Sequence, residues 1–378
     1  MTIEPFTIDI PQTTLDDLRE RLHRTRWTDE VESAGWDYGT NQTYLQELVR
    51  YWQTQYDWRE QEAKLNQFAQ FRADIDGFGV HFIHERGTGP KPLPIILLHG
   101  WPDSFFRMVK VLPLLTDPAR NGRDPIDSFD VIVPSLPGFG FSDRPRQRGG
   151  IDAGMLCARL MTDVLGYTRF GAHGGDTGSP IAQALTVKQP DAVVGIHLTD
   201  IGWNNRLSPD MPNLSPAEQQ YLKTLQTWTF SEGGYIMIQG TKPQTLAYGL
   251  NDSPVGLAAW IVEKFRGWSD CHGNVEQRFT KDELLTNIMI YWITETINSW
   301  IRGYYEGMHG QAGEAAHPNQ VPVGMAVFPI DNPTPRETAE RFLNIQHWTQ
   351  MPRGGHFAAL EEPELLVADI RAFFRPLR

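Results

Sequence analysis

The sequence predicts an α/β protein with a mostly parallel, doubly wound sheet, a helical lid and an N-terminal meander. Three observations predict this class. Short apolar runs typical of buried parallel strands occur at 94–98 and 129–134. Helical stretches alternate with these runs, and each run ends in a loop rich in glycine and proline. Such alternation predicts a parallel sheet that binds its ligand beyond the carboxyl ends of its strands.

Composition and charge narrow the function classes. With 378 residues the chain exceeds the usual size of one simple core, so we expect a core domain with substantial additions. The net charge of -12, without a long basic run, argues against a nucleic-acid partner or an anionic membrane surface. The N-terminus lacks the pattern of a signal peptide, and no window is apolar enough to span a membrane. We therefore expect a cytoplasmic protein without a membrane anchor, and a homodimer stays open.

The N-terminal segment 1–75 is polar, rich in tryptophan and helical in tendency. Leu15, Leu18 and Leu22 recur at helical spacing, and such a face needs a surface to pack on. We therefore expect an accessory meander that wraps around the core. Its tryptophans are expected to anchor it there, rather than to bind substrate: Trp27, Trp36, Trp52 and Trp58.

The core is predicted in two parts, 76–200 and 321–378, separated by a lid at 201–320. Residues 201–320 are helical and aromatic and are interrupted by glycines, as expected of a helical insertion over the active edge of a sheet. Strands are expected at 71–75, 80–82, 94–98, 129–134, 170–172, 193–199 and 323–330, and helices at 105–115, 154–165 and 363–374. Two buried free thiols are expected at Cys157 and Cys271, because their spacing fits neither a metal site nor a disulfide framework.

The most informative stretch runs from Gly174 to Gly178, with Asp176 at its centre. It has the pattern Gly-x-nucleophile-x-Gly, in which a cramped strand-to-helix turn pushes the central side chain out over the sheet. A carboxylate in that position can attack an activated sp3 carbon, such as that of an epoxide or an alkyl halide, to give a stable ester. The alternative is a glycine-rich turn in which Asp176 only caps a helix.

Two later residues complete a candidate catalytic set. Asp331 directly follows the predicted strand at 323–330, and His356 lies between a predicted strand and the last helix. Nucleophile, acid and histidine thus occur in the chain order of an α/β-hydrolase. A single histidine is more often structural, but this position favours His356 as the base.

Such a reaction also needs hydrogen-bond donors that stabilise negative charge on oxygen. The N–H groups of Trp101 and Thr177 are candidates for an oxyanion hole, while His99 is expected to support the loop that carries Trp101. A tyrosine hydroxyl could stabilise the oxygen of an opening epoxide. The lid offers Tyr235 and Tyr304 as a pair. Spacing alone leaves other lid tyrosines open: Tyr221, Tyr248, Tyr291 and Tyr305.

Several motifs along the chain carry a family resemblance. They are Trp27, WDYG at 36–39, HGWP at 99–102, PSLPGFGFS at 134–142, GGD at 174–176, NDSPVGLAA at 251–259 and RGGHFAALEEP at 353–363. On these motifs the chain resembles epoxide hydrolases of the microsomal and juvenile-hormone type, which have the α/β-hydrolase fold and an extra N-terminal region. The resemblance implies that Asp176 is the nucleophile, His356 the base and Asp331 its acid partner. It also implies Tyr235 and Tyr304 as the lid donors, although a slip of one residue would exchange Tyr304 for Tyr305.

The resemblance implies hydrolysis of an apolar epoxide to a vicinal diol. Its partners would be the epoxide and water, with no cofactor and no metal. Two alternatives remain open. A haloalkane or haloacid dehalogenase would use the same aspartate and histidine, with a tryptophan N–H such as that of Trp101 binding the halide. A ligand-binding protein on the same fold could have lost catalysis.

Overall fold

The computed structural model describes residues 2–310 and 320–378. Within them nine strands form one sheet in the order β1-β2-β3-β5-β4-β6-β7-β8-β9. Pairing is antiparallel from β1 to β5 and parallel from β5 to β9, so the predicted, mostly parallel sheet is confirmed. The strands are β1 (Ile3–Pro5), β2 (Gln70–Ile75), β3 (Phe78–Glu85), β4 (Leu93–Leu98), β5 (Phe129–Pro134), β6 (Phe170–Gly174), β7 (Val193–Leu198), β8 (Val323–Val327) and β9 (Ile345–Gln350).

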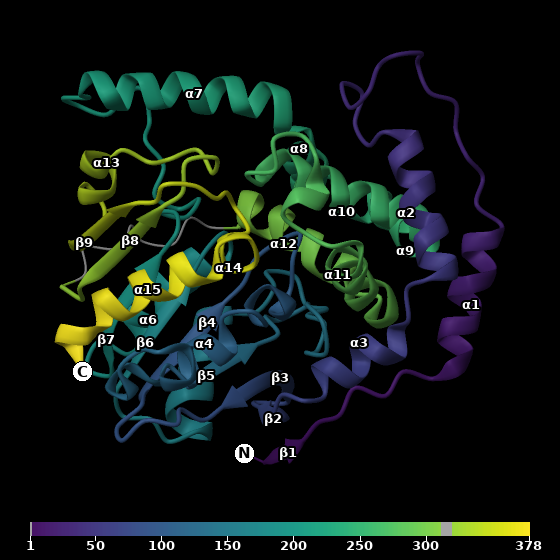
Figure 1. Ribbon diagram of the computed structural model, residues 1–378. Coiled ribbons are helices and arrows are strands. Elements are labelled where there is room, and N and C mark those ends of the chain that lie inside the picture. The colour runs from purple at the N-terminus through teal and green to yellow at the C-terminus, as the bar shows by residue number, and fades with distance from the viewer. Residues whose placement is uncertain (1, 311–319) are drawn as a thin grey trace.

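Helices cover the sheet and extend beyond one end of it (Figure 1). Those of the sheet region are α4 (Leu112–Thr116), α5 (Ala153–Arg159), α6 (Gly178–Lys188), α13 (Arg336–Glu340), α14 (Ala358–Glu361) and α15 (Pro363–Phe374). Between β7 and β8 come α7 (Pro216–Glu232), α8 (Gly234–Thr241), α9 (Pro243–Asp252), α10 (Pro254–Trp268), α11 (Lys281–Thr294) and α12 (Ile297–His309). Part of the predicted lid, residues 311–319, lies outside the described residues. No described helix is long and apolar enough to span a membrane.

The N-terminal segment forms α1 (Gln12–His23), α2 (Gln42–Thr54) and α3 (Trp58–Leu65), and it also adds β1 to the sheet. Its helices α1 and α2 contact α10 of the insertion, and Figure 1 shows them along its outer side. Arg21 in α1 pairs with Asp252 at 2.7 Å. Trp52 and Trp58 are buried, as expected of anchors, but Trp27 is 40% exposed. Trp27 lies in the irregular loop after α1, so the expectation that it anchors the segment is wrong.

Two predicted helices are interrupted. The stretch 105–115 is a 3-10 turn at Phe105–Met108 followed by α4, because Pro113 has no N–H to continue a helix through that point. The stretch 154–165 is α5 followed by a π-helical turn at Leu160–Val164.

Strand β8 ends at Val327, three residues before the predicted end. Its last residue, Val327, pairs with Gln350 in β9. The strand does not continue because Pro329 has no N–H to donate to a neighbouring strand. Asp331 therefore sits on a loop, four residues beyond the strand, rather than directly at its end. This loop gives its carboxylate the reach to meet a residue from another segment.

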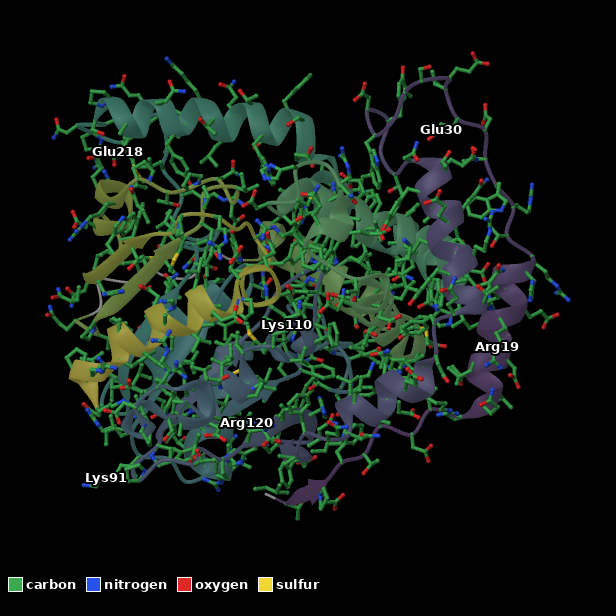
Figure 2. The ribbon with its side chains drawn as sticks, in the orientation of Figure 1. Arg19, Glu30, Lys91, Lys110, Arg120 and Glu218 are labelled. Carbon is green, nitrogen blue, oxygen red and sulfur yellow. The ribbon has the colours of Figure 1, made fainter. Side chains whose placement is uncertain are left out.

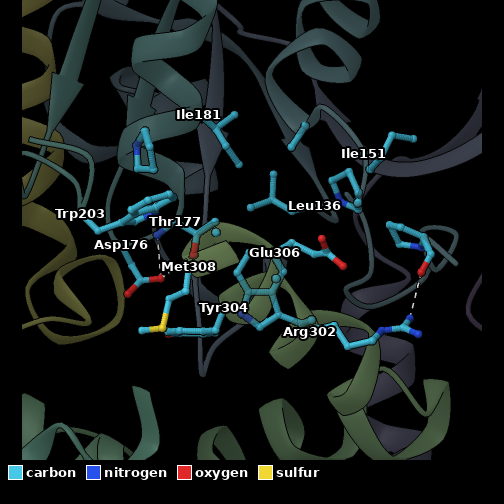
Figure 3. A pocket seen from close by; sticks show the side chains of 18 of the residues that line it. Leu136, Ile151, Asp176, Thr177, Ile181, Trp203, Arg302, Tyr304, Glu306 and Met308 are labelled. Carbon is cyan, nitrogen blue, oxygen red and sulfur yellow. Dashed lines mark hydrogen bonds between the residues drawn. The ribbon is translucent and has the colours of Figure 1, made fainter. Parts of the chain in front are cut away.

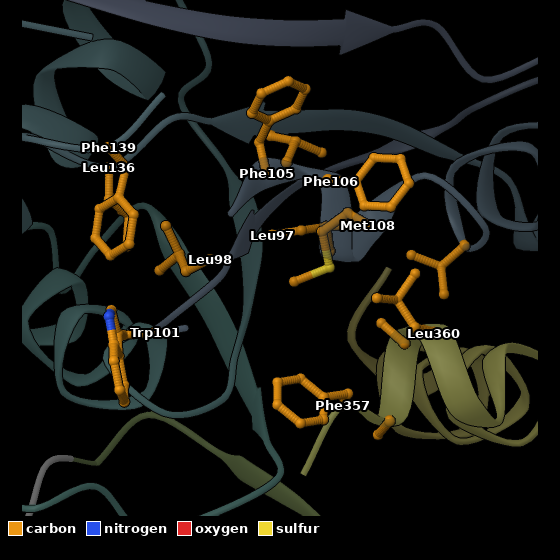
Figure 4. Packing of buried hydrophobic residues seen from close by; sticks show 14 of the residues in the cluster. Leu97, Leu98, Trp101, Phe105, Phe106, Met108, Leu136, Phe139, Phe357 and Leu360 are labelled. Carbon is orange, nitrogen blue, oxygen red and sulfur yellow. The ribbon is translucent and has the colours of Figure 1, made fainter. Parts of the chain in front are cut away.

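Buried apolar side chains fill the space beneath the carboxyl ends of the strands (Figure 4). Leu97 and Leu98 of β4, together with Trp101 and Phe139, have no exposed surface. Charged residues such as Arg19 and Glu30 point outward instead (Figure 2). Glu218 in α7 is an exception: it is buried and accepts hydrogen bonds from Arg341 at 2.5 and 2.8 Å. This pair ties α7 to the loop after α13.

Candidate active site

The turn between β6 and α6 holds Asp176 with a φ of 55°, a left-handed conformation that is strained for a non-glycine residue. Its glycines are required by close packing. A Cβ on Gly174 would lie 2.3 Å from the carbonyl oxygen of Gly178, and one on Gly178 would lie 2.2 Å from that of Leu98. The turn therefore projects the Asp176 side chain over the end of the sheet, as the glycine pattern predicts.

The two oxygens of the Asp176 carboxylate have different surroundings. Oδ1 accepts hydrogen bonds from the N–H of Trp101 at 3.0 Å, and from the N–H and hydroxyl of Thr177 at 2.6 and 2.8 Å. Gly100 permits this approach, because a Cβ there would lie 2.2 Å from Oδ1. Oδ2 instead faces Nε2 of His356 at 3.5 Å. One oxygen is held by three donors, while the other faces the imidazole.

His356 lies between two carboxylates. Its Nδ1 is 3.0 Å from Oδ1 of Asp331, and its backbone N–H donates to the carbonyl of Trp268 at 2.9 Å. Burial lowers the pKa of His356, but the charge and hydrogen bond of Asp331, helped by Asp176, outweigh burial and raise the pKa to about 9. The imidazolium is therefore the dominant form of His356 near neutral pH in the free enzyme.

Tyr235 and Tyr304 lie on the opposite wall, from α8 and α12. The Tyr235 ring stacks on Trp101 with centroids 5.1 Å apart, and its centroid is 5.9 Å from that of Tyr304. Burial raises the pKa of both hydroxyls, so they stay protonated near neutral pH. Tyr305 does not line this cavity and stacks on His309 with centroids 4.1 Å apart. The structure thus brings Tyr304, rather than Tyr305, to the site.

The other lid tyrosines that spacing left open are engaged elsewhere. Tyr221 shares a hydrogen bond with Thr334 at 3.2 Å, and Tyr291 donates to the carbonyl of Asp103 at 2.6 Å. Tyr248 is 71% exposed. Neither Tyr221, Tyr248 nor Tyr291 lines the cavity that contains Asp176.

The candidate residues meet in one cavity of about 920 Å³ (Figure 3). Six predicted residues line it: Asp176, Thr177, Tyr235, Tyr304, Asp331 and His356. Trp101, the seventh, is fully buried beneath it and contributes its backbone N–H. His99 accepts a hydrogen bond from the N–H of Leu136 at 3.1 Å, and burial lowers the pKa of its imidazole to about 3. It therefore supports the loop, as predicted.

Asp200 is a site residue that the sequence analysis missed. It follows β7, and its Oδ2 accepts the backbone N–H of Asp176 at 2.6 Å, while its Oδ1 accepts that of Gly202 at 2.8 Å. Burial, and then the nearby Asp331 carboxylate, raise the pKa of Asp200 to about 6. An acidic residue directly after the run at 193–199 was the available signal. Its carboxylate helps to hold the strained turn at Asp176.

A buried ion pair beneath the site was also missed. Asp103 accepts the N–H of Gly100 at 3.1 Å and pairs with Nε of Arg107 at 2.8 Å. Arg107 in turn donates to the backbone carbonyl of His356. The pair therefore joins the loop that carries Trp101 to the loop that carries His356. The i, i+4 spacing of opposite charges was the only signal for it.

Two family models match the chain, and its relatives include named epoxide hydrolases. Residues 3–108 match the family described as epoxide hydrolase N terminus, and residues 94–231 match the alpha/beta hydrolase fold. A protein of Stigmatella aurantiaca (strain DW4/3-1) named as a candidate epoxide hydrolase is 44% identical, over all of this chain and 86% of its own length. Epoxide hydrolase 1 of Oryctolagus cuniculus is 36% identical, over 98% of this chain and 88% of its own length.

The chain belongs to the epoxide hydrolase family. The solved structure of juvenile hormone epoxide hydrolase from Bombyx mori is similar as well, with a TM-score of 0.85 and 29% identity over 100% of this chain and 94% of that one. The predicted family and fold are therefore confirmed, and this member is an epoxide hydrolase by class. The catalytic roles of individual residues remain proposals.

Three further expectations for this epoxide hydrolase concern groups outside the catalytic set. Cys157 and Cys271 are buried free thiols, as predicted. The indole N–H of Trp101, which a dehalogenase would need for its halide, is buried and does not line the cavity. Within the described residues no cluster of histidine, cysteine and acidic side chains could hold a metal. The expectation of a reaction without metal or cofactor stays a prediction.

Proposed function

We propose that the enzyme hydrolyses an apolar epoxide to a vicinal diol through a covalent ester on Asp176. Oδ2 of Asp176 is the attacking atom, because Oδ1 is held by the donors of Trp101 and Thr177. Attack breaks one carbon–oxygen bond of the epoxide, and the hydroxyls of Tyr235 and Tyr304 stabilise the oxygen that is released. The product of this step is a hydroxyalkyl ester.

The ester is then hydrolysed by water. His356 removes a proton from the water, which attacks the carbonyl carbon of the Asp176 ester, and Asp331 stabilises the imidazolium that forms. The carbonyl oxygen is Oδ1, so the N–H groups of Trp101 and Thr177 already face the atom on which negative charge develops. The bond from the carbonyl carbon to Oδ2 breaks, Oδ2 takes the proton held by His356, and it leaves as a hydroxyl of the diol.

The first step prepares the second electrostatically. The Asp176 carboxylate helps to raise the pKa of His356 in the free enzyme. Forming the ester removes that negative charge, so the pKa of His356 falls and more of the imidazole is in the neutral form that can accept a proton from water. We therefore expect His356 to act in the second step, since Asp176 is already an anion in the first.

The observation that carries this proposal is the arrangement around Asp176, with one oxygen held by backbone donors and the other facing His356 at 3.5 Å. The test is a single turnover of styrene oxide in H2 18O with enzyme in excess. The diol is expected to take its new oxygen from Asp176 and to contain no 18O, while the Asp176 peptide gains 18O. Label in the diol would mean direct attack by water and would overturn the ester mechanism.

Assays with bromoalkanes and styrene oxide distinguish two other functions. A dehalogenase would release halide from bromoalkanes and leave styrene oxide unchanged. A ligand-binding protein without catalysis would turn over neither substrate class. The buried indole of Trp101 and the paired tyrosines in the cavity both favour the epoxide reaction over these alternatives.

A further inference from the structure

We propose that the substrate also carries an anionic group, such as a carboxylate, which Arg302 and Arg146 bind at the end of the cavity away from Asp176. This inference deepens the proposed function and rests on it. It concerns which epoxides the site selects. Figure 3 shows Asp176 and Arg302 on opposite sides of the cavity.

Cationic side chains line part of the cavity. The chain has a net charge of -12, yet four arginines line the cavity: Arg146, Arg148, Arg206 and Arg302. Among the described residues, none of these four forms an ion pair with a carboxylate. Most other arginines near a carboxylate are paired, as Arg144 is with Glu295 at 3.7 Å. Other arginines without an ion pair lie elsewhere on the protein, so these four are distinguished by their position at the cavity that a substrate would enter.

Arg302 is the best placed of the four. It extends from α12, is partly buried, and its Nη2 donates to the carbonyl of Pro145 at 2.9 Å. Burial lowers the pKa of Arg302, and the nearby cations of Arg144 and Arg146 lower it further. A bound anion would offset this repulsion between like charges, and a planar guanidinium matches a carboxylate in geometry.

Two carboxylates line the cavity near these arginines, those of Asp152 and Glu306, and Asp152 is paired with Lys188 at 2.6 Å. Glu306 is the one that acts on Arg302. It accepts the backbone N–H of Gly149 at 2.9 Å, and its charge raises the pKa of Arg302. The three cations of Arg146, Arg148 and Arg302 still outnumber these two carboxylates. The local charge stays positive, which favours an anionic group over a cationic one.

The middle of the cavity is apolar. Leu136 and Ile181 line it between Asp176 and Arg302, as Figure 3 shows, and Ile151 lines it further toward the Arg302 side. A substrate that fits would have an epoxide at Asp176, an apolar chain and a carboxylate at Arg302. The structure thus favours an amphiphilic epoxide over a wholly apolar one.

The test compares 10,11-epoxyundecanoic acid with its methyl ester, which differ only in the charged end. We expect the wild-type enzyme to show a higher kcat/KM for the acid, mainly through a lower KM. In Arg302→Gln and Arg146→Gln the ratio of kcat/KM for acid to ester should fall about 10-fold, as expected for one charge-assisted pair. Added salt should lower the wild-type ratio in the same direction.

The matched control is Arg144→Gln. Arg144 lies nearby but is paired with Glu295, and it does not line the catalytic cavity, so replacing it should change the acid-to-ester ratio far less than replacing Arg302 or Arg146 does. Equal kcat/KM for acid and ester in the wild type, or an unchanged ratio in both Arg302→Gln and Arg146→Gln, would overturn this inference.

Styrene oxide separates the two proposals: if it is hydrolysed but the acid is not preferred, only the anionic subsite fails. If neither styrene oxide nor the ester is hydrolysed, the proposed function itself fails.

Discussion

Replacing Asp331 with asparagine should change the charge state of His356. The pKa of His356 is raised from 6.5 to about 9, and Asp331 supplies the two largest contributions that raise it. Without them, burial and the Arg107 cation lower the pKa, and they outweigh the smaller effect of Asp176. The pKa should therefore fall below 6.5. This change corresponds to at least about 3 kcal/mol of lost preference for the imidazolium, at about 1.4 kcal/mol for each pKa unit.

The assay is an NMR titration of the imidazole Cε1–H signal, assigned by its absence in His356→Gln. The wild type should titrate near pH 9 and Asp331→Asn below pH 6.5, while the conservative Asp331→Glu should recover most of the raised pKa. Because the folded-state pKa of His356 is raised, its stabilising effect is complete below about pH 6.5 and is lost as the pH rises through about 9. A variant whose His356 still titrates near pH 9 would refute the assignment of Asp331 as its partner.

Three further variants test other parts of the site. Tyr304→Phe should slow formation of the ester at least about 10-fold in stopped-flow measurements, whereas Tyr305→Phe should react at the wild-type rate; the reverse result would exchange their roles. Gly100→Ala should fold, as judged by circular dichroism, but lose alkylation, because its Cβ would lie 2.2 Å from Oδ1 of Asp176; normal alkylation would contradict the geometry of the oxyanion loop. Asp103→Asn should lower the free energy of unfolding in urea by about 3–5 kcal/mol, because it leaves the Arg107 cation buried and unpaired; a loss below about 1 kcal/mol would show that the pair is dispensable.

Local sequence patterns predicted much of this architecture. The glycines around Asp176 act through backbone conformation and close packing. Five consecutive residues are therefore enough to predict the strand-to-helix turn. His356 has a similar local signal, since two glycines precede it and a helix follows it. Alternating apolar runs likewise predicted the parallel strands, because burial on both faces of a sheet leaves a continuous apolar stretch.

Residues that act on the backbone of a segment far away in the sequence could not be predicted from local patterns. Asp200 acts by accepting the backbone N–H of Asp176, and Asp103 by accepting that of Gly100 and pairing with Arg107. Sequence spacing does not encode which N–H group a carboxylate will meet after folding. Tyr304 and Tyr305 point in directions about 100° apart around the axis of α12, because successive residues of a helix differ by that angle. Only the rotation of α12 in the folded protein decides which of them faces the cavity.

The central claim is the covalent ester on Asp176, and the intact mass of His356→Gln after incubation with styrene oxide tests it most directly. Ester formation does not need His356 as a base, whereas ester hydrolysis does, so the intermediate should accumulate. We expect a gain of one styrene oxide mass that maps to the peptide containing Asp176. An unchanged mass together with continued diol formation, or labelling by a bromoalkane alone, would contradict it.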